Sequence, residues 1–413
     1  MPVNALTFNQ AATVLNSIMA QATGRNDLST AVNSAEFVQQ AQTALLTGFD
    51  TITNAINQVL SRTIFSIRPY DAKFKGLEVS ESAWGNHVRK LSIADKDFQD
   101  DDRYKWPVGY DASQNPADGN GQSVDPFVIN KPDILQTNFY GQSVYENSYT
   151  LFRDQLQQAF RGPDEFNEFV TLILTNRSNK LEQARENMAR MTLTNLIGSC
   201  IAAEDNNVRS TGMGYIKLLS AYNAATGLSL TTTTVFQPAN YKPFIQWAYG
   251  YIANLSYMFT ERTSDLYQTT VNNKHIPRHT PYEDQRIYLN AGHRFAVEMM
   301  ALADTYHDSY LKKVDGEAVG FWQASKDPQN IKVTANYTTA AGAIASASVD
   351  TTAEGYGAVL GVILDRNAAG YAVTQAWSEP AINARGGYTT YWDHATLRNW
   401  NDNTEKAVAL LLA

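Results

Sequence analysis

The sequence predicts an α+β fold, and three observations support this class. Apolar residues recur at helical spacing from Pro163 toward Ile201, which indicates one long helix. Residues 63 to about 150 lose helical periodicity and contain scattered glycines and prolines. After Val359, apolar and aromatic runs alternate with Gly, Asn and Asp turns, which is typical of strands.

Two amphipathic helices are predicted in the first part of the chain. Thr7 and Gln10 form a capping-box pattern ahead of a first apolar stripe. A second stripe begins near Ser34 and ends near Arg68-Pro69, because the residue before a proline disfavours helix. The stripe residues are Ala11, Leu15, Ile18 and Met19, then Val38, Ala41, Leu45, Ile52, Ile56 and Val59. Either the same chain or a neighbouring subunit covers these stripes, and the sequence leaves both alternatives open.

The irregular segment has strand-like pieces at Val88 to Ile93 and Gln136 to Tyr145, on either side of a polar middle. It has too little packing material to be a domain, and an isolated hairpin is marginally stable, so a neighbouring molecule is the natural source of its stability. An acidic run lies within it, with Lys96 and Arg103 interleaved: Asp95, Asp97, Asp100, Asp101 and Asp102. This run is a solvated loop tip, a salt-bridging contact with a neighbouring subunit or a calcium site, although its spacing does not match the EF-hand loop.

The long helix is predicted to begin at Pro163, which suits a first helical turn, and Asp164 and Glu165 complement the helix dipole there. Roughly forty residues at about 1.5 Å each would span on the order of 60 Å. A coiled-coil rod is the competing interpretation, but the repeat covers few heptads and the polar stretch from Asn176 to Asn179 interrupts it.

Residues 205 to 355 are predicted to form a mixed α+β region. Asn240 is expected to cap a helix with the stripe Phe244, Trp247, Tyr251, Leu255 and Met258. A short strand is expected at Arg286 to Leu289, followed by a helical stretch containing Phe295, Met299 and Leu302. The Ala-, Thr- and Ser-rich stretch from Asn336 to Thr352 is interpreted as surface loops or edge strands.

The C-terminal region is predicted to be a strand-turn-strand unit followed by two more strands. Val359 to Leu364 leads into a turn from Asp365 to Gly370, where Gly370 would permit positive φ, and Tyr371 to Trp377 returns. After Pro380, a Gly-Gly-Tyr hinge precedes a strand that reaches about Trp400. An Asn401-Asp402-Asn403 turn and the run from Lys406 to Leu412 follow.

An aspartate-bearing hairpin, an Asn-x-x-Gly-x-Tyr corner at Asn383, Gly386 and Tyr388, and a terminal apolar strand occur here in that order. This arrangement resembles the end of the major capsid proteins of tailed bacteriophages, which have the Hong Kong 97 fold. The resemblance implies five segments. They are an N-terminal arm (1–62), an extended loop with its return strand (63–150), a peripheral domain with a spine helix (151–204), an axial domain (205–355) and C-terminal strands that complete both domains (356–413).

The resemblance also implies a function. The chain would be a virion protein that assembles in the host bacterial cytoplasm into pentamers and hexamers of an icosahedral shell. That shell would enclose double-stranded DNA without sequence-specific binding, with portal, scaffolding or decoration proteins as partners and no membrane. An encapsulin-like compartment and an enzyme with an unrecognised active site are the alternatives. Some relatives join a loop lysine to a neighbour's asparagine, but Lys73, Lys75 and Lys90 are interpreted as ordinary surface lysines.

Composition is consistent with a folded shell subunit. The net charge of −8 argues against a protein that grips nucleic acid, since phosphate neutralisation needs a concentrated basic patch. Cys200 is the single cysteine and lies in an apolar helical segment, so core packing is expected. The first residues lack the basic region of a signal peptide, and no apolar stretch approaches the ~20 residues that span a bilayer.

The sequence predicts no catalytic, cofactor or metal site. His275 and His279 have no acidic or cysteine partner to complete a zinc pattern, and Pro277 lies between them. Asp393 and His394 are neighbours in a predicted strand, so their side chains would point to opposite faces and could not act together as a relay. A non-enzymatic, structural role is therefore expected.

Overall fold

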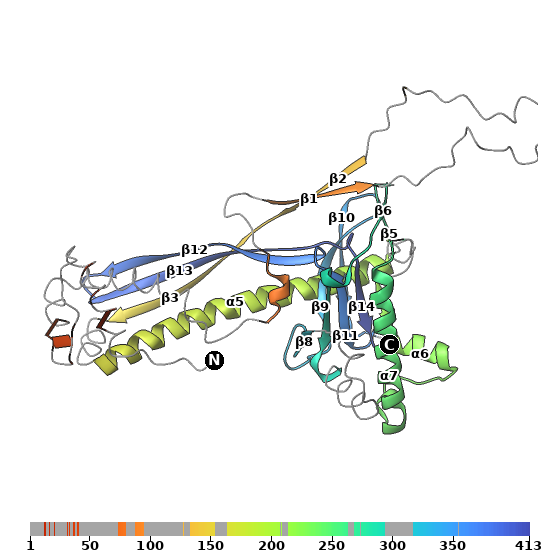
Figure 1. The fold of residues 1–413 in the computed structure, drawn as a ribbon, viewed down its shortest axis with the longest axis horizontal. Coiled ribbons are helices and arrows are strands. Elements are labelled where there is room, and N and C mark those ends of the chain that lie inside the picture. The colour runs from red at the N-terminus through yellow and green to blue at the C-terminus, as the bar shows by residue number, and fades with distance from the viewer. Residues whose placement is uncertain are drawn as a thin grey trace, which may run out of the picture. The chain divides into compact units, whose positions relative to one another are not determined.

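The computed structural model describes residues 12–13, 16, 20, 31, 33, 36–37, 39–40, 73–79, 87–94, 127, 133–152, 163–206, 208, 214–262, 268–272, 274–293, 317–353 and 355–413 (Figure 1). These residues fall into two compact units. Unit 1 takes the described residues of Met1–Asn86 together with Tyr140–Thr194 and Ala369–Asn401. Unit 2 takes those of His87–Phe139, Asn195–Ala368 and Asp402–Ala413. The Thr7–Gln10 capping box, the acidic run and the helical stretch around Met299 lie outside the described residues.

Two short N-terminal pieces of unit 1 can be described. Asn33 caps the helical residues Glu36 and Phe37, because its Oδ1 accepts the Glu36 backbone N–H at 2.9 Å and its amide donates to Glu36 Oε1 at 3.1 Å. Farther along, the 3₁₀ turn η2 (Lys75–Leu77) follows Phe74, whose φ of 65° is uncommon for a bulky residue. Phe74 is fully buried, and its packing holds it in this conformation.

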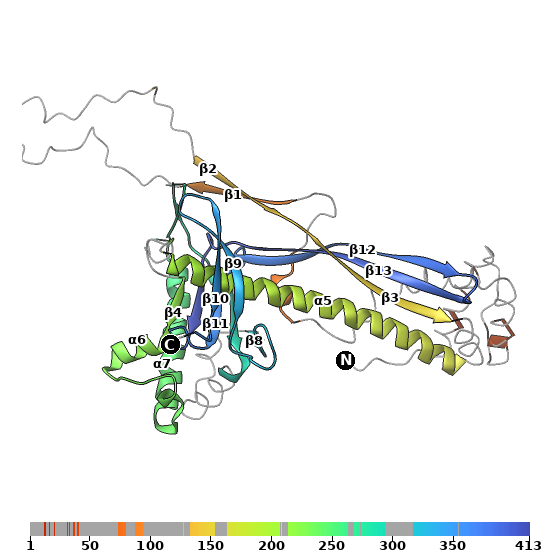
Figure 2. The same cartoon turned by 180° about the vertical axis from the view of Figure 1, so that it is seen from behind.

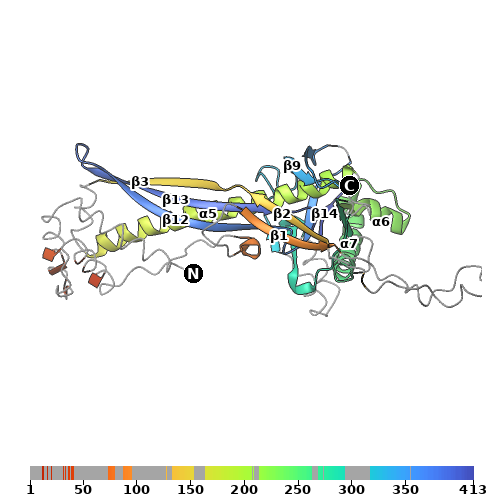
Figure 3. The same ribbon diagram turned by 90° about the horizontal axis from the view of Figure 1, so that it is seen from above.

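Unit 1 is built on a three-stranded antiparallel sheet in the order β12-β13-β3. Its strands are β3 (Ser143–Phe152), β12 (Ala369–Asn383) and β13 (Tyr388–Asn401). They lie side by side in every view, and the first part of the long helix α5 (Pro163–Asp205) follows one face of the sheet (Figure 1, Figure 2 and Figure 3). The predicted Gly-Gly-Tyr hinge is the turn of the β12–β13 hairpin, where Gly387 has φ of +64°.

The prediction of one long helix is confirmed. Helix α5 has 43 residues and begins at Pro163, as expected from the proline signal. Between Met188 and Ala203 most of its side chains are buried, and a helix with apolar residues all round is typical of a buried position. Gly198 contributes to this packing in unit 2, because a Cβ there would lie 2.6 Å from Val333 Cγ2.

Unit 2 contains a five-stranded mixed sheet in the order β4-β14-β11-β7-β8. Its strands are β4 (Tyr215–Lys217), β14 (Ala407–Leu411), β11 (Val359–Asp365), β7 (Gln285–Asn290) and β8 (Glu317–Val319). Three two-stranded pairs accompany it: β1 (His87–Ala94) with β2 (Asp133–Tyr140), β5 (Gln268–Val271) with β6 (Lys274–Pro277), and β9 (Lys332–Thr338) with β10 (Ile344–Asp350). The predicted strands at Arg286–Leu289, Val359–Leu364 and Lys406–Leu412 are therefore confirmed.

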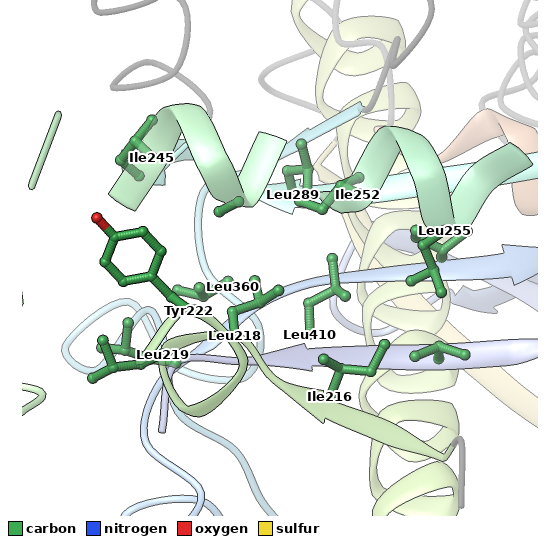
Figure 4. Packing of buried hydrophobic residues seen from close by; sticks show 14 of the residues in the cluster. Ile216, Leu218, Leu219, Tyr222, Ile245, Ile252, Leu255, Leu289, Leu360 and Leu410 are labelled. Atoms are coloured by element: carbon green, nitrogen blue, oxygen red, sulfur yellow. The ribbon is translucent and has the colours of Figure 1, made fainter. Parts of the chain in front are cut away.

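The core of unit 2 lies between this sheet and two helices, α6 (Leu218–Thr226) and α7 (Pro238–Phe259). Figure 4 shows Ile252 and Leu255 of α7 packed near Leu289 and Leu410 of the central strands. Short 3₁₀ turns, η4 (Thr234–Phe236) and η6 (Tyr282–Asp284), precede α7 and β7. Every side chain of β11 and β14 is buried, which explains their near-continuous apolar sequences.

Four sequence expectations are wrong in detail, and the first three concern the bounds and pairing of elements. Helix α7 begins at Pro238 rather than after Asn240, because a proline with fixed φ suits the first helical position; the Asn240 amide instead donates to the Thr234 carbonyl at 3.0 Å. Strands β11 and β12 do not pair as a hairpin, since β11 pairs with β7 and β14 whereas β12 pairs with β13. Strand β12 also continues through Pro380 to Asn383, which is tolerated because β12 is an edge strand.

The expectation that Gly370 has a positive φ in a turn is also wrong. It lies inside β12 and is not among the glycines with positive φ. Its role is close packing, since a Cβ at this position would lie 2.4 Å from Cζ2 of its cross-strand partner Trp400. The turn chemistry of Asp365 is as expected, because its Oδ1 accepts the Asn367 backbone N–H at 2.8 Å.

Lys406 is a charged residue inside unit 2. Its Nζ donates to the Phe259 carbonyl at 3.0 Å and lies 5.6 Å from the centre of the Phe259 ring. Burial lowers the pKa of the Lys406 ammonium to about 7, against the opposing effect of the Asp365 and Glu405 carboxylates, while Arg278 lowers it further. The unfolded chain, with an ordinary lysine pKa, therefore binds more protons than the folded chain above about pH 7.

This difference predicts a pH-dependent stability. The free energy of unfolding should rise as the pH increases from about 7 toward 10, because the folded state no longer holds a buried charge. In Lys406→Met this rise should shrink by roughly 1–3 kcal/mol relative to the natural chain. Urea unfolding at several pH values measures it, with Lys332→Met, which changes an exposed lysine, as the control. Parallel pH profiles for the natural chain and Lys406→Met would contradict the prediction.

Candidate assembly surfaces

The lysines considered for cross-linking are not equivalent. Lys73 and Lys75 are exposed beside η2. Lys90 is not an ordinary surface lysine, so that interpretation is wrong for this residue. Its side chain is largely buried and forms ion pairs with Asp402, at 2.5 Å, and with Glu405. No local sequence pattern could indicate these ion pairs, because the partners lie more than 300 positions away along the chain.

The sequence singled out Cys200, His275 and His279 as candidate reactive residues. Cys200 is buried and its thiol lies 3.6 Å from the Ala407 carbonyl, as the packing prediction expected. His275 belongs to β6, although its side chain lies outside the described residues, and His279 is exposed. Among the described residues, no three His, Cys, Asp or Glu side chains are grouped so that they could hold a metal ion.

An ion pair joins α5 to the sheet within unit 1. Arg177 Nη2 lies 2.7 Å from Asp393 Oδ1, and both side chains are mostly buried. Burial raises the pKa of the Asp393 carboxyl, and the Arg177 guanidinium opposes that rise. Next to this pair, Tyr149 stacks on Tyr391 at 5.1 Å between ring centres, and burial raises the pKa of Tyr149 to about 12. These groups hold the helix to the sheet.

A cavity of about 750 Å³ lies between α5 and the sheet, beside the ion pair. Its lining includes Ala376 and Ala395 of the sheet and Leu181 and Ala184 of α5. Charged side chains of both signs line it, and the cationic ones include Arg177, which already pairs with Asp393. The cavity therefore has no net charge preference that would select a ligand.

The opposite face of this sheet carries aromatic side chains. His394 lies across from Trp377 in the register and stacks on it at 5.1 Å between ring centres, whereas its neighbour Asp393 contacts the helix. The expectation that Asp393 and His394 point to opposite faces is thus consistent with their contacts. Phe152 and Tyr388 form a second cross-strand aromatic pair at 5.4 Å. Exposed aromatic side chains such as Phe152 and Trp377 are suited to protein contact.

The ribbon of β1 and β2 exposes large aliphatic side chains. Leu91 is 55% exposed, Ile93 is 64% exposed and Ile134 is 59% exposed. On β1 these positions alternate with Lys90 and Ser92, which are more buried, as expected for a strand with one face toward its own unit. We call Leu91, Ile93 and Ile134 the aliphatic set. The sequence indicated strands here but did not indicate that this set would be left uncovered.

The helices that the structure describes include none with the length and apolarity needed to span a bilayer. In a search of curated proteins, no sequence matches this chain. The sequence model of the Phi29-like phage major capsid protein family matches residues 15–409.

The chain also matches solved phage structures at low sequence identity. The capsid of Staphylococcus phage Andhra is 11% identical, with 85% of this chain and 86% of that chain covered and a TM-score of 0.48. A head fiber and inner core structure of bacteriophage P68 is 10% identical, with 84% and 86% covered and a TM-score of 0.47. The mature capsid of bacteriophage PhiM1 is 11% identical, with 84% and 88% covered and a TM-score of 0.41.

The family match spans nearly the whole chain, so it applies to both units and not to a fragment of one. The helices and sheets described above confirm the predicted α+β class, and the family match confirms the predicted role as a phage head shell subunit. This chain belongs to the Phi29-like phage major capsid protein family.

Proposed function

We propose that copies of this chain form the pentamers and hexamers of an icosahedral head shell that encloses double-stranded DNA. The observation that carries this proposal is the uncovered aliphatic set on the β1–β2 ribbon, in a chain whose family builds phage heads. A two-stranded ribbon gains little stability alone, and exposed aliphatic area of this kind is typical of a contact surface. A second copy of the chain is the partner that a shell supplies at every position.

The proposal includes the finer roles implied by the resemblance. Residues 1–62 act as an N-terminal arm, 63–150 as an extended loop, 151–204 as a peripheral domain, 205–355 as an axial domain, and 356–413 complete both domains. Portal and scaffolding or decoration proteins join the shell, which assembles in the host bacterial cytoplasm. The role is structural and not catalytic. The net charge of −8 supports a wall that does not adhere strongly to packaged DNA.

Within the extended loop, we assign the acidic run of Asp95, Asp97, Asp100, Asp101 and Asp102 to a contact between subunits. An acidic surface contact is weak for each pair but is repeated at every equivalent position of a shell.

The first prediction concerns particle size. The purified protein, alone or with its scaffolding protein, should form rings or closed shells far heavier than the 45.8 kDa chain. Light scattering and electron microscopy measure this directly. A protein that remains a well-behaved monomer under all assembly conditions, scaffold included, would show that the shell proposal is wrong.

The second prediction tests the aliphatic set with a matched pair of variants. Ile134→Glu adds a charge where apolar area should be buried between copies, whereas Gln136→Glu adds the same charge two residues away on an exposed polar position of β2. Burying one such side chain contributes roughly 1.5–3 kcal/mol, so Ile134→Glu should raise the protein concentration needed for assembly at least tenfold. Circular dichroism should show both variants folded. If the two variants assemble equally well, the aliphatic set is not part of the interface.

A third prediction separates the acidic run from the aliphatic set. Replacing the five aspartates with asparagine should weaken assembly mildly at low salt, and the difference from the natural chain should fade as salt screens surface charges. Assembly yields measured across a salt series test this, with Ile134→Glu as the comparison whose defect should persist. A defect that is absent at low salt would assign the run to a solvated loop tip.

A further inference from the structure

Strand β1 is attached to the rest of unit 2 through polar contacts on its inner face. Lys90 pairs with Asp402 at 2.5 Å and with Glu405, and two residues farther along Ser92 Oγ accepts a hydrogen bond from Arg278 Nη2 at 3.4 Å. Arg278 in turn pairs with Glu405 at 2.8 Å. We call Lys90, Arg278, Asp402 and Glu405 the root cluster, because it lies where β1 meets β6 and the turn before β14.

The root cluster has balanced charge and is mostly removed from water. Two cations face two anions, and the side chains of Asp402 and Glu405 are only 2% and 6% exposed. Burial raises the pKa of the Asp402 carboxyl, but Lys90 and the Thr404 hydrogen bonds outweigh it and hold that pKa below its ordinary value. Asp402 also organises its own turn, since Oδ1 accepts the Thr404 N–H at 2.8 Å and the Thr404 hydroxyl at 2.6 Å. The hydrogen bonds from Thr404 therefore orient the Asp402 carboxylate independently of Lys90.

Apolar packing contributes little to this attachment. Of the β1 side chains that the structure describes, only the small Ala94 is buried, and Val88 on the same face is half-buried. The larger apolar side chains, Leu91 and Ile93, are on the exposed face. The contacts of Lys90 and Ser92 are two residues apart, so a slip of β1 by one residue would turn both away from their partners and place Leu91 against the buried carboxylates. The cost of leaving a buried charge unpaired opposes that slip.

We propose that Lys90 is a positioning residue and that the root cluster is a latch, which fixes the register and attachment of β1 at the root of the extended loop. The latch keeps the charged face on unit 2 and the aliphatic set toward a neighbouring copy. This inference rests on the proposed role of the loop in assembly. The attachment of β1 is a property of the single subunit, so it can be measured without assembly.

The experiment compares amide hydrogen exchange in unassembled, full-length subunits. Lys90→Met alone would leave Asp402 buried without its cation and could unfold the unit, so the main variant is Lys90→Met with Asp402→Asn. This double variant keeps the local charge balanced and retains the Arg278–Glu405 pair. The latch predicts at least tenfold faster exchange for amides of β1 and β2, with unchanged exchange in β11 and β14. Lys332→Met, which breaks an exposed ion pair with Asp350 in the same unit, is the matched control and should change neither region.

Two outcomes would overturn the latch. Unchanged exchange in β1 would show that Lys90 does not hold the root. Equal acceleration in β1, β11 and β14 would show that the cluster supports the core of unit 2 and not the loop. Neither result depends on shell formation, so a failure of the latch is distinguishable from a failure of the proposed function.

Discussion

The burial of one continuous helix is the constraint on which the other elements depend. Helix α5 has 43 residues, and most of the stability of a helix in a protein comes from the elements packed against it. Within unit 1 its cover is the β12-β13-β3 sheet, held by the Arg177–Asp393 pair and the hydrogen bond from Lys180 to Asn147. Within unit 2 its final turns pack against β9 so closely that Gly198 has no room for a Cβ. The C-terminal sequence supplies strands to both units. Each unit therefore has strands that pack near its own part of α5.

Local sequence patterns predicted the elements well and their partners poorly. The apolar runs at Val359 and Lys406 and the aromatic run after Tyr388 identified strands, because burial and β-propensity are properties of a short stretch. Pairing is not local. Strand β13 pairs with β3, and Tyr391 lies opposite Tyr149, so no turn signal near either residue could indicate the contact. The expected β11–β12 hairpin failed for the same reason: the Asp365 turn is real, but the chain uses it to pass from one sheet to another.

On the candidate surfaces too, the strands could be predicted from the sequence but their contacts could not. Alternation along β1 predicted a strand, but only the structure shows that Lys90 faces buried carboxylates while Leu91 and Ile93 face outward. By hydropathy alone, the lysine would be assigned to solvent and the aliphatic residues to a core. This arrangement is the reverse of the usual one. Because β1 buries its charged side chains and exposes its aliphatic ones, its apolar surface is available for another molecule to cover. The acidic run from Asp95 remains a sequence-based proposal.

Buried ion pairs at the root of a loop serve a purpose that apolar packing would not. Replacing such pairs with apolar groups is often neutral or stabilising, so their contribution is better sought in specificity than in the free energy of unfolding. Lys90 has its partners at one register only, where Asp402 is held by hydrogen bonds within its own turn. A shell requires every copy to present its contact surface in the same place, since an error in one subunit is carried to its neighbours. A charged root and an apolar outer face on one ribbon meet that requirement. The root cluster fixes the position of the ribbon, and the aliphatic set remains available to contact another copy during assembly.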